Sequence, residues 1–234
     1  MTPVSDSAAQ TTPANPASAN LATCSVTDPG DYTYDRLDYC LTGFQITYTE
    51  YSEVVRCDAL FPYATQTSTG CVIPAVRPQI TLSLTTYGAA AALYGFAEQY
   101  WIDAWGTNGS PLQRQPNPTI QAANRLNTCG AGATRPFVID DDIVPTDSCD
   151  EYPFAATYQG GKNGGLCADV FPLLENGTWD LYADPNAPAY TLDEPCLRGH
   201  VPSAENSLVG PALGDFAKSQ RVIDGDQYNV VVTP

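Results

Sequence analysis

Two adjacent carboxylates, Asp150 and Glu151, are the residues of this 234-residue chain whose types and spacing are best suited to chemistry. They follow Cys149 directly and precede an aromatic–proline–aromatic step at 152–154. Neighbouring acids repel each other, so a fold that holds two of them at fixed positions usually lets them share a cation or a proton. The pair therefore predicts a site for acid–base or metal chemistry, with a solvated turn after a disulfide cysteine as the alternative.

Three other groups invite a chemical interpretation that the sequence does not favour. The acidic run at 140–142 has the ligand type for calcium, but no glycine-spaced EF-hand loop follows, so we expect a solvated turn. His200 lies in a segment without clear periodicity, and we expect it on the surface. The glycine-rich stretch at 160–165 is no phosphate loop, because no Gly-Lys-Ser/Thr closes it.

The charge balance limits the classes of protein that fit. The chain has 26 acidic and 10 basic residues, a net charge of −16. This balance argues against binding nucleic acid by phosphate neutralisation alone, and it suits an extracellular protein or one that recruits divalent cations. Hydrophobic residues make up 43% of the chain, enough to build a packed core.

The cysteines indicate disulfides rather than zinc, because their number is even, no C-x-x-C pair occurs and histidine is nearly absent. They are Cys24, Cys40, Cys57, Cys71, Cys129, Cys149, Cys167 and Cys196. Disulfides predict an oxidising compartment, so we expect a secreted, extracellular protein. The pairings Cys24–Cys40 and Cys57–Cys71 close the shortest loops, and Cys167–Cys196 would close a later one, although spacing alone leaves the connectivity open. No apolar run is long enough for a membrane span.

Composition divides the chain into three parts. Residues 1–22 are rich in Ser, Thr, Ala, Pro and Asn, which predicts a flexible tail or linker, or a peptide trimmed from a precursor. Residues 23–78 carry four cysteines and near-alternating apolar positions at 44–51, which predicts a disulfide-stapled β-rich module. Residues 79–234 form the third part, with an irregular insertion near 174–204.

Periodicity within the third part predicts an α+β fold. Alternation indicates strands at 80–84, 167–171 and 228–232. Helical spacing of apolar residues predicts a long helix at 89–105, which should pack on a sheet, and a short helix at 119–126. A further helix is expected at 211–219, with Pro211 at its first position.

The string Cys149-Asp150-Glu151-Tyr152-Pro153-Phe154-Ala155 resembles the signature of the NucA/NucB family of secreted deoxyribonucleases. Further similarities occur in the family's order: Pro111-Leu112-Gln113-Arg114, Asn124-Arg125 with Cys129, Asn206 with Gly210, Leu213 and Phe216, and 221–226 before a Val-rich strand. The resemblance extends from Gln79 to the C-terminus. The module before it resembles the N-terminal part of longer actinobacterial members.

This resemblance implies a secreted, metal-dependent endonuclease that cleaves DNA with little sequence preference. The implied fold is a small mixed or antiparallel sheet with helices and a ββα-metal-like nuclease site. Asp150 would be the general base, and Glu151 would support the metal or orient Asp150. The implied metal ligands are Glu151, Asn206 and Asp215, and the implied cofactor is a divalent cation, Mg²⁺ or Mn²⁺, since hard cations prefer oxygen ligands.

The resemblance also implies a mode of substrate binding, in which Arg114 and Arg125 hold phosphate. DNA is the expected substrate, a cognate inhibitor protein is a further expected partner, and we expect a monomer. The alternative function is a catalytically silent NucA/NucB-like module that binds or scaffolds at a cell surface. In that case the arginines pair with acids, Asn206 caps a helix and Asp215 is an ordinary exposed residue.

The chain departs from the family pattern in its predicted first helix. Members usually place a basic residue or a histidine there, where this chain has Tyr94 or Phe96. The glycine-rich segment that follows Asn206 in the family is reduced to 207–210, and the stretch 174–204 is unusually long.

Overall fold

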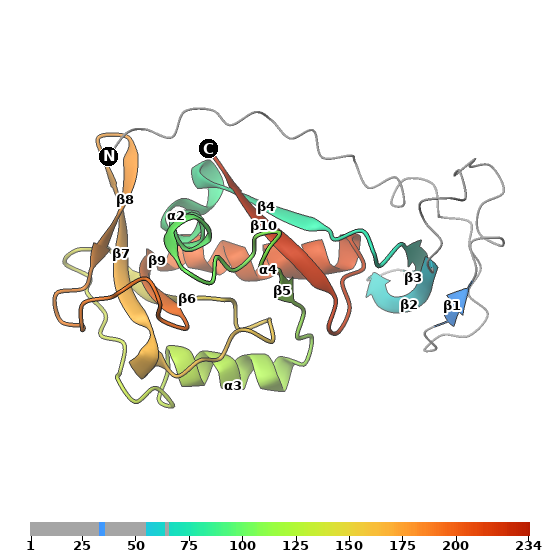
Figure 1. Ribbon diagram of the computed structural model, residues 1–234, viewed down its shortest axis with the longest axis horizontal. Coiled ribbons are helices and arrows are strands. Elements are labelled where there is room, and N and C mark those ends of the chain that lie inside the picture. The colour runs from blue at the N-terminus through green and yellow to red at the C-terminus, as the bar shows by residue number, and fades with distance from the viewer. Residues whose placement is uncertain (1–32, 36–54, 64–65) are drawn as a thin grey trace. The chain divides into compact units, whose positions relative to one another are not determined.

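The computed structural model describes residues 33–35, 55–63 and 66–234, which fall into two units, 1–76 and 77–234 (Figure 1). In the first unit, three strands form an antiparallel sheet in the order β1-β2-β3. They are β1 (Thr33–Asp35), β2 (Val55–Tyr63) and β3 (Gln66–Val72). The register places Cys57 directly opposite Cys71, and the disulfide expected between them from their spacing stays a prediction. The predicted alternation at 44–51 and the cysteines at 24 and 40 lie outside the described residues.

The second unit contains two small mixed sheets, so the α+β class is confirmed. In the first sheet, of order β4-β10-β5, β4 runs parallel to β10 and β5 runs antiparallel to it. In the second, of order β6-β9-β7-β8, only β7 and β9 are parallel. The strands are β4 (Gln79–Ser83), β5 (Leu112–Gln113), β6 (Asp147–Tyr152), β7 (Ala168–Glu175), β8 (Thr178–Ala183), β9 (Leu197–Pro202) and β10 (Gln227–Thr233).

Three α-helices and one short 3₁₀ turn complete the described part of this unit. They are α2 (Leu84–Tyr100), α3 (Pro118–Thr128), the turn η2 (Gly164–Leu166) and α4 (Ser203–Ser219). The side chain of Asn117 caps α3 and is followed by proline at the first helical position, which is a strong local start signal. Ser83 caps α2 by accepting a hydrogen bond from the backbone N–H of Thr86.

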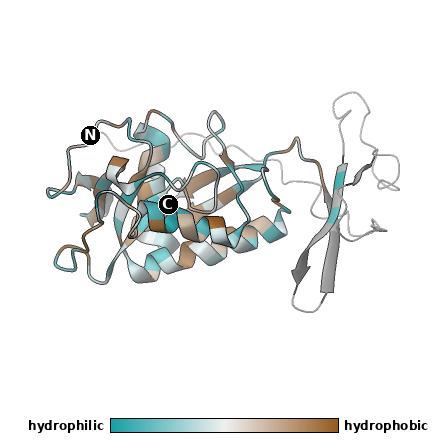
Figure 2. Ribbon diagram, turned by 90° about the horizontal axis from the view of Figure 1, so that it is seen from below, coloured by the Kyte–Doolittle hydropathy of each residue, from teal (hydrophilic) through white to brown (hydrophobic). Residues whose placement is uncertain are grey.

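Helix α2 is the central element of the core, because it contacts strands of both sheets as well as α4. Its buried segment begins with four alanines, Ala89–Ala92, whose small side chains let the surrounding elements approach closely. Leu93 and Tyr94 follow and have no exposed surface either, so this part of the helix is covered on all sides. Hydrophobic and hydrophilic residues alternate within the helices and strands that surround this core (Figure 2).

Most predicted elements are present with shifted ends. The strands expected at 80–84, 167–171 and 228–232 are β4, β7 and β10, and the short helix at 119–126 is α3. The long helix begins earlier than predicted and ends at Tyr100 instead of 105, where Trp101 turns to an extended conformation. A disulfide joins Cys167 to Cys196, as expected, and a second joins Cys129 to Cys149. No helix in the described residues is long and apolar enough to cross a bilayer.

Two predictions for the last third of the chain are wrong. The stretch 174–204 is not irregular throughout, because it contains β8 and the almost fully buried strand β9. Polar residues obscured β9, since Arg198 and His200 are buried against acids that lie far away in the sequence. The last helix begins at Ser203 rather than at Pro211, which lies exposed within α4.

Candidate active site

Strand β6 separates the two carboxylates that the sequence places side by side. Its register with β9 is regular from Asp147 to Tyr152, so successive side chains point to opposite faces of the sheet. The contacts agree with this alternation: Asp150 meets α2, whereas Glu151 meets α3. The two acids are therefore not a couple that shares one ion, and each has its own environment.

The environment of Asp150 is dry and contains one strong donor. Asp150 is 5% exposed, and its Oδ2 accepts a hydrogen bond of 2.5 Å from the hydroxyl of Tyr94. Burial raises the pKa of Asp150 to about 7, although the hydrogen bonds from Tyr94 and from the backbone of Glu151 act in the opposite direction. Asp150 is thus a carboxyl group that exchanges a proton near neutral pH.

Glu151 lies on the other face, beside the Cys129–Cys149 disulfide that joins α3 to β6. Burial and then the charge of Asp150 raise its pKa to about 8, and Arg125 opposes this shift. Nε of Arg125 is 3.9 Å from Oε1 of Glu151, while the Arg125 side chain is 54% exposed. Arg125 is therefore held by an acid on one side and open to solvent on the other.

The first turn of α4 joins the strand just before Asp150. Nδ2 of Asn206 donates hydrogen bonds to Oγ of Ser148 at 3.1 Å and to the carbonyl oxygen of Cys149 at 3.0 Å. Asn206 is not a helix cap, because Pro202 occupies that position. Its neighbour Glu205 accepts a hydrogen bond of 2.6 Å from the backbone N–H of Ala89 in α2. The structure thus brings the predicted Asn206 to β6, on the same face as Asp150.

The other predicted binding residues lie elsewhere. Asp215 is on α4 nine residues after Asn206; its side chain is 80% exposed and pairs with Lys218 at 3.4 Å. Arg114 directly follows β5, is half-buried and directs Nη1 to the carbonyl oxygen of Ala156 at 3.5 Å. Burial lowers the pKa of Arg114.

The predicted ligand set does not fit a single metal ion. Glu151 faces α3, Asn206 lies on the opposite face of β6, and Asp215 projects into solvent. Within the described ranges, no group of three or more His, Cys, Asp or Glu side chains is arranged to hold a metal. Carboxylate and amide oxygens have the right chemistry for Mg²⁺, but in these three residues they do not converge.

One acid near this site was missed by the sequence interpretation. Glu98 lies one helical turn after Tyr94 in α2, and its Oε1 is buried without a hydrogen-bond partner. Burial raises the pKa of Glu98 to about 8, against the effect of a hydrogen bond with Tyr152. The sequence feature that could have revealed Glu98 is its position on the apolar face of the predicted helix, four residues after Tyr94. An acidic residue is unusual at such a position.

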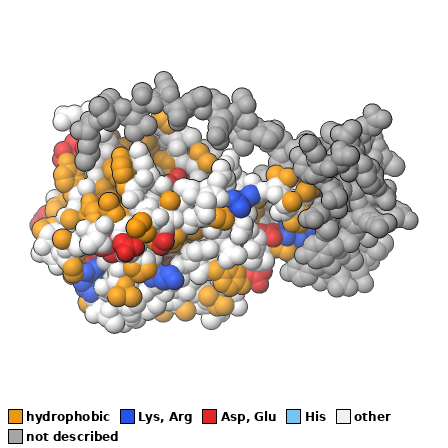
Figure 3. Space-filling view, viewed as in Figure 1, with side chains coloured by type: hydrophobic (Ala, Val, Ile, Leu, Met, Phe, Trp, Pro, Cys, Tyr) orange, Lys and Arg blue, Asp and Glu red, His pale blue; other side chains and the backbone are white. Residues whose placement is uncertain are grey.

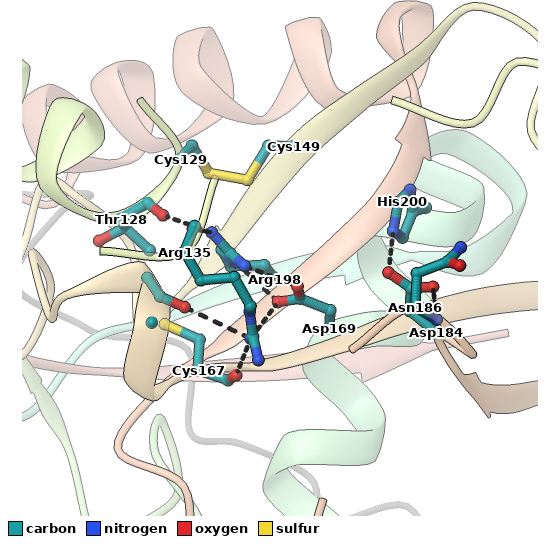
Figure 4. A network of polar contacts seen from close by, with 12 residues as sticks. Thr128, Cys129, Arg135, Cys149, Cys167, Asp169, Asp184, Asn186, Arg198 and His200 are labelled. Atoms are coloured by element: carbon teal, nitrogen blue, oxygen red, sulfur yellow. Dashed lines mark hydrogen bonds and ion pairs between the residues drawn. A yellow bond between two sulfur atoms is a disulfide. The ribbon is translucent and has the colours of Figure 1, made fainter. Parts of the chain in front are cut away.

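The α3 face of the second sheet also carries a buried polar network (Figure 4). Arg198 of β9 donates to both carboxylate oxygens of Asp169 at 2.7 and 2.6 Å, and Arg135 pairs with the same acid at 3.1 Å. Arg198 also donates to the carbonyl oxygens of Thr128 and Arg135, so it fastens the end of α3 to the sheet. Both arginines, Arg198 and Arg135, are thus held by interactions with Asp169 and with backbone carbonyl groups inside the fold.

The prediction of a surface histidine is wrong, because β9 is an inner strand. His200 is 1% exposed and stacks on Phe171 with ring centroids 3.9 Å apart. Its Nδ1 lies 2.7 Å from Oδ2 of Asp147, which also accepts the backbone N–H of Asp140. His200 thus helps to hold the acidic turn at 140–142 in place, through Asp147. It is buried in this contact and does not serve as the general base of the site.

Comparisons of the chain with models of protein families, with curated proteins and with solved structures find no match.

Proposed function

We propose that this protein is a secreted endonuclease that hydrolyses DNA phosphodiester bonds with little sequence preference, and that Asp150 is its general base. The sequence support is the ordered set of motifs that resemble the NucA/NucB family, from Pro111 to the Val-rich strand β10. Two disulfides are compatible with an oxidising, extracellular setting.

The observation that carries the proposal is the environment of Asp150. A general base works best when its pKa lies close to the working pH, because it must accept a proton from water and then release it. Burial gives Asp150 such a pKa, about 7, while the hydroxyl of Tyr94 keeps one carboxylate oxygen in a fixed position. An exposed aspartate has neither property.

Phosphate binding is assigned to Arg125 on α3, with Arg114 as a second contact; because Arg125 lies on the face of β6 opposite to Asp150, it would hold a DNA phosphate other than the one that is cleaved. The exposed half of the Arg125 side chain faces solvent, and its ion pair with Glu151 restricts the guanidinium to the surface of α3. A guanidinium binds phosphate through two parallel N–H donors, so a partly fixed arginine loses less freedom on binding. In this proposal Glu151 acts by orienting Arg125.

A divalent cation, Mg²⁺ or Mn²⁺, is part of the proposal as a requirement of the reaction. Negative charge builds on the phosphate oxygens during hydrolysis, and a divalent ion stabilises it. The residues that would hold this ion are left unassigned, because Glu151, Asn206 and Asp215 do not meet.

The test is cleavage of supercoiled plasmid by the purified chain with Mg²⁺ or Mn²⁺. We expect nicking that EDTA abolishes and that Asp150→Ala and Asp150→Asn both abolish. Asp193→Asn is the matched control, because it removes an exposed acid and should keep full activity. A folded wild-type protein that cleaves no DNA with several divalent ions would contradict the proposal.

The second candidate function is a silent module that binds or scaffolds at a cell surface. It is favoured by the separation of Asp150 and Glu151 and by the pairing of Arg135 and Arg198 with one buried acid, Asp169. On one face of the molecule, the visible basic side chains form small separate groups rather than a continuous patch (Figure 3). The plasmid assay separates the two candidates, since a silent module leaves the plasmid intact.

A further inference from the structure

Tyr94 in α2 makes a short, buried hydrogen bond to Asp150. Neither the tyrosine nor the aspartate has more than a few per cent of its surface exposed, and the Oη···Oδ2 distance is 2.5 Å. A hydrogen bond to an ionised carboxylate is shorter and stronger than one between neutral groups, and a dry environment strengthens it further. This bond therefore fixes the direction of the Asp150 carboxylate.

The ring of Tyr94 is itself held by the two aromatic residues that follow the acids. Its centroid lies 5.0 Å from that of Tyr152 and 4.9 Å from that of Phe154, the latter in an edge-to-face arrangement. Tyr152 and Phe154 are 5.0 Å apart and also meet edge to face. Such aromatic contacts have preferred geometries, so three rings in mutual contact restrict the rotation of each.

We infer that Tyr94 is a positioning residue for Asp150, and that Phe154 acts one step further away by fixing the ring of Tyr94. The inference rests on the proposed function, in which Asp150 accepts a proton from water. Tyr94 binds Oδ2 and the backbone of Glu151 also donates to the carboxylate, so Asp150 takes the proton in an orientation that its neighbours fix. The motif Asp-Glu-Tyr-Pro-Phe thus supplies the base together with aromatic support for its hydrogen-bond donor.

Other charged or titratable groups approach Asp150 from the elements around it. From α2 this is Tyr94, and from β6 itself it is Glu151, whereas Glu98, one turn after Tyr94, acts on the neighbouring Tyr152. The first turn of α4 carries Glu205, whose carboxylate is bound to the backbone of Ala89. The residue opposite Asp150 on β9 is Gly199, which brings no side chain. Among these groups, Tyr94 is the side chain with a hydrogen bond to Asp150.

The first experiment measures kcat and KM of the full chain on duplex DNA with Mg²⁺ or Mn²⁺. Tyr94→Phe should lower kcat about 10- to 100-fold with little change in KM, because a misdirected base slows the chemical step without weakening DNA binding.

Phe154→Leu should lower kcat less than Tyr94→Phe does. Its effect should vanish when Tyr94→Phe is already present, because Phe154 acts through Tyr94. Tyr158→Phe is the matched control, since it removes another tyrosine–aspartate bond, to Asp224, on the surface. Wild-type kcat in Tyr94→Phe would overturn the inference.

The second experiment does not depend on activity. A buried tyrosine hydroxyl that is bound to a carboxylate exchanges slowly with water, so its proton should appear as a shifted signal in the NMR spectrum of the wild-type protein. The signal should disappear in Tyr94→Phe and in Asp150→Ala, and it should persist in Tyr158→Phe.

If the wild-type protein lacks the signal, the inference fails whatever the activity. If the signal is present but no DNA is cleaved, the contact stands and the proposed function fails. If Tyr94→Phe does not fold, the NMR signal of the wild-type protein and the kcat of Phe154→Leu still test whether Tyr94 positions Asp150.

Discussion

The carboxylate of Glu205 in α4 accepts a hydrogen bond from the backbone N–H of Ala89 in α2 at a distance of 2.6 Å. Gly88, immediately before, has a φ of +47°, so the regular part of α2 begins again at Ala89. The first N–H groups of a helix lack partners within the helix, and an anion is stabilised there. A side chain of α4 thus caps the central helix of the core.

Replacing Glu205 should therefore destabilise the protein through α2. We expect Glu205→Ala to lower the free energy of unfolding by about 1–2 kcal/mol, which is typical for the loss of a helix cap. Glu205→Gln should cost less, because it retains an acceptor oxygen and loses only the charge. Urea unfolding measures both. Ser207→Ala, on the exposed side of the same turn, is the control and should stay within about 0.5 kcal/mol of wild type. Equal losses in Glu205→Ala and Ser207→Ala would refute the cap.

Gly199 allows β9 to approach α2 beside Asp150. A Cβ atom at this position would lie 2.6 Å from Cδ2 of Leu93, which is fully buried. We expect Gly199→Ala to cost about 1–3 kcal/mol, the usual range for overpacking a core. Gly210→Ala in α4 is the control with the opposite sign, because nothing lies near its added methyl group and alanine favours a helix by about 1 kcal/mol. A thermal melt compares the two, and a neutral Gly199→Ala would contradict the packing argument.

The buried pair Arg198–Asp169 should be sensitive to the loss of one partner. Arg198→Met leaves the buried Asp169 carboxylate with only its ion pair to Arg135, and we expect a loss of about 3–5 kcal/mol. The double variant Arg198→Met/Asp169→Leu should recover part of this loss, because it also removes the carboxylate that has lost its bidentate partner. Lys218→Ala, which breaks the exposed pair with Asp215, should cost less than about 1 kcal/mol. A double variant that is no more stable than Arg198→Met would show that the charge is not the cause.

Local patterns in the sequence were enough to predict β4, β10 and α3. The spacing of apolar residues acts within a few positions, so it can be seen without the rest of the fold. Strand β6 gave no such pattern, because both of its faces are covered and both carry polar groups. Its period of two, which separates Asp150 from Glu151, was hidden by the similarity of the two side chains.

The candidate site was predicted in part. Asn206 binds β6 at Ser148 and Cys149, just before Asp150, in agreement with the order of the motifs, but Asp215 projects into solvent. Tyr94 and Glu98 could not be found from motifs, since helical spacing assigns both to the core. Their importance comes from contacts across more than 50 residues of sequence, which no local pattern reports.

The half-buried acid Glu98, whose Oε1 is enclosed, should make stability fall as the pH rises. Its pKa is about 8 in the folded protein and 4.5 is the ordinary value, so the folded state binds more protons between these limits. Stability from this group is complete below about pH 4.5 and is lost as the pH rises through 8. Asp150 and Glu151, whose pKa values are raised in the same direction, add to this slope. We expect Glu98→Gln to flatten the dependence and to be more stable than wild type at pH 8.5. Urea unfolding at several pH values between 5 and 8.5 measures it, and a wild-type protein that becomes more stable over this range would show that Glu98 is not buried in its neutral form.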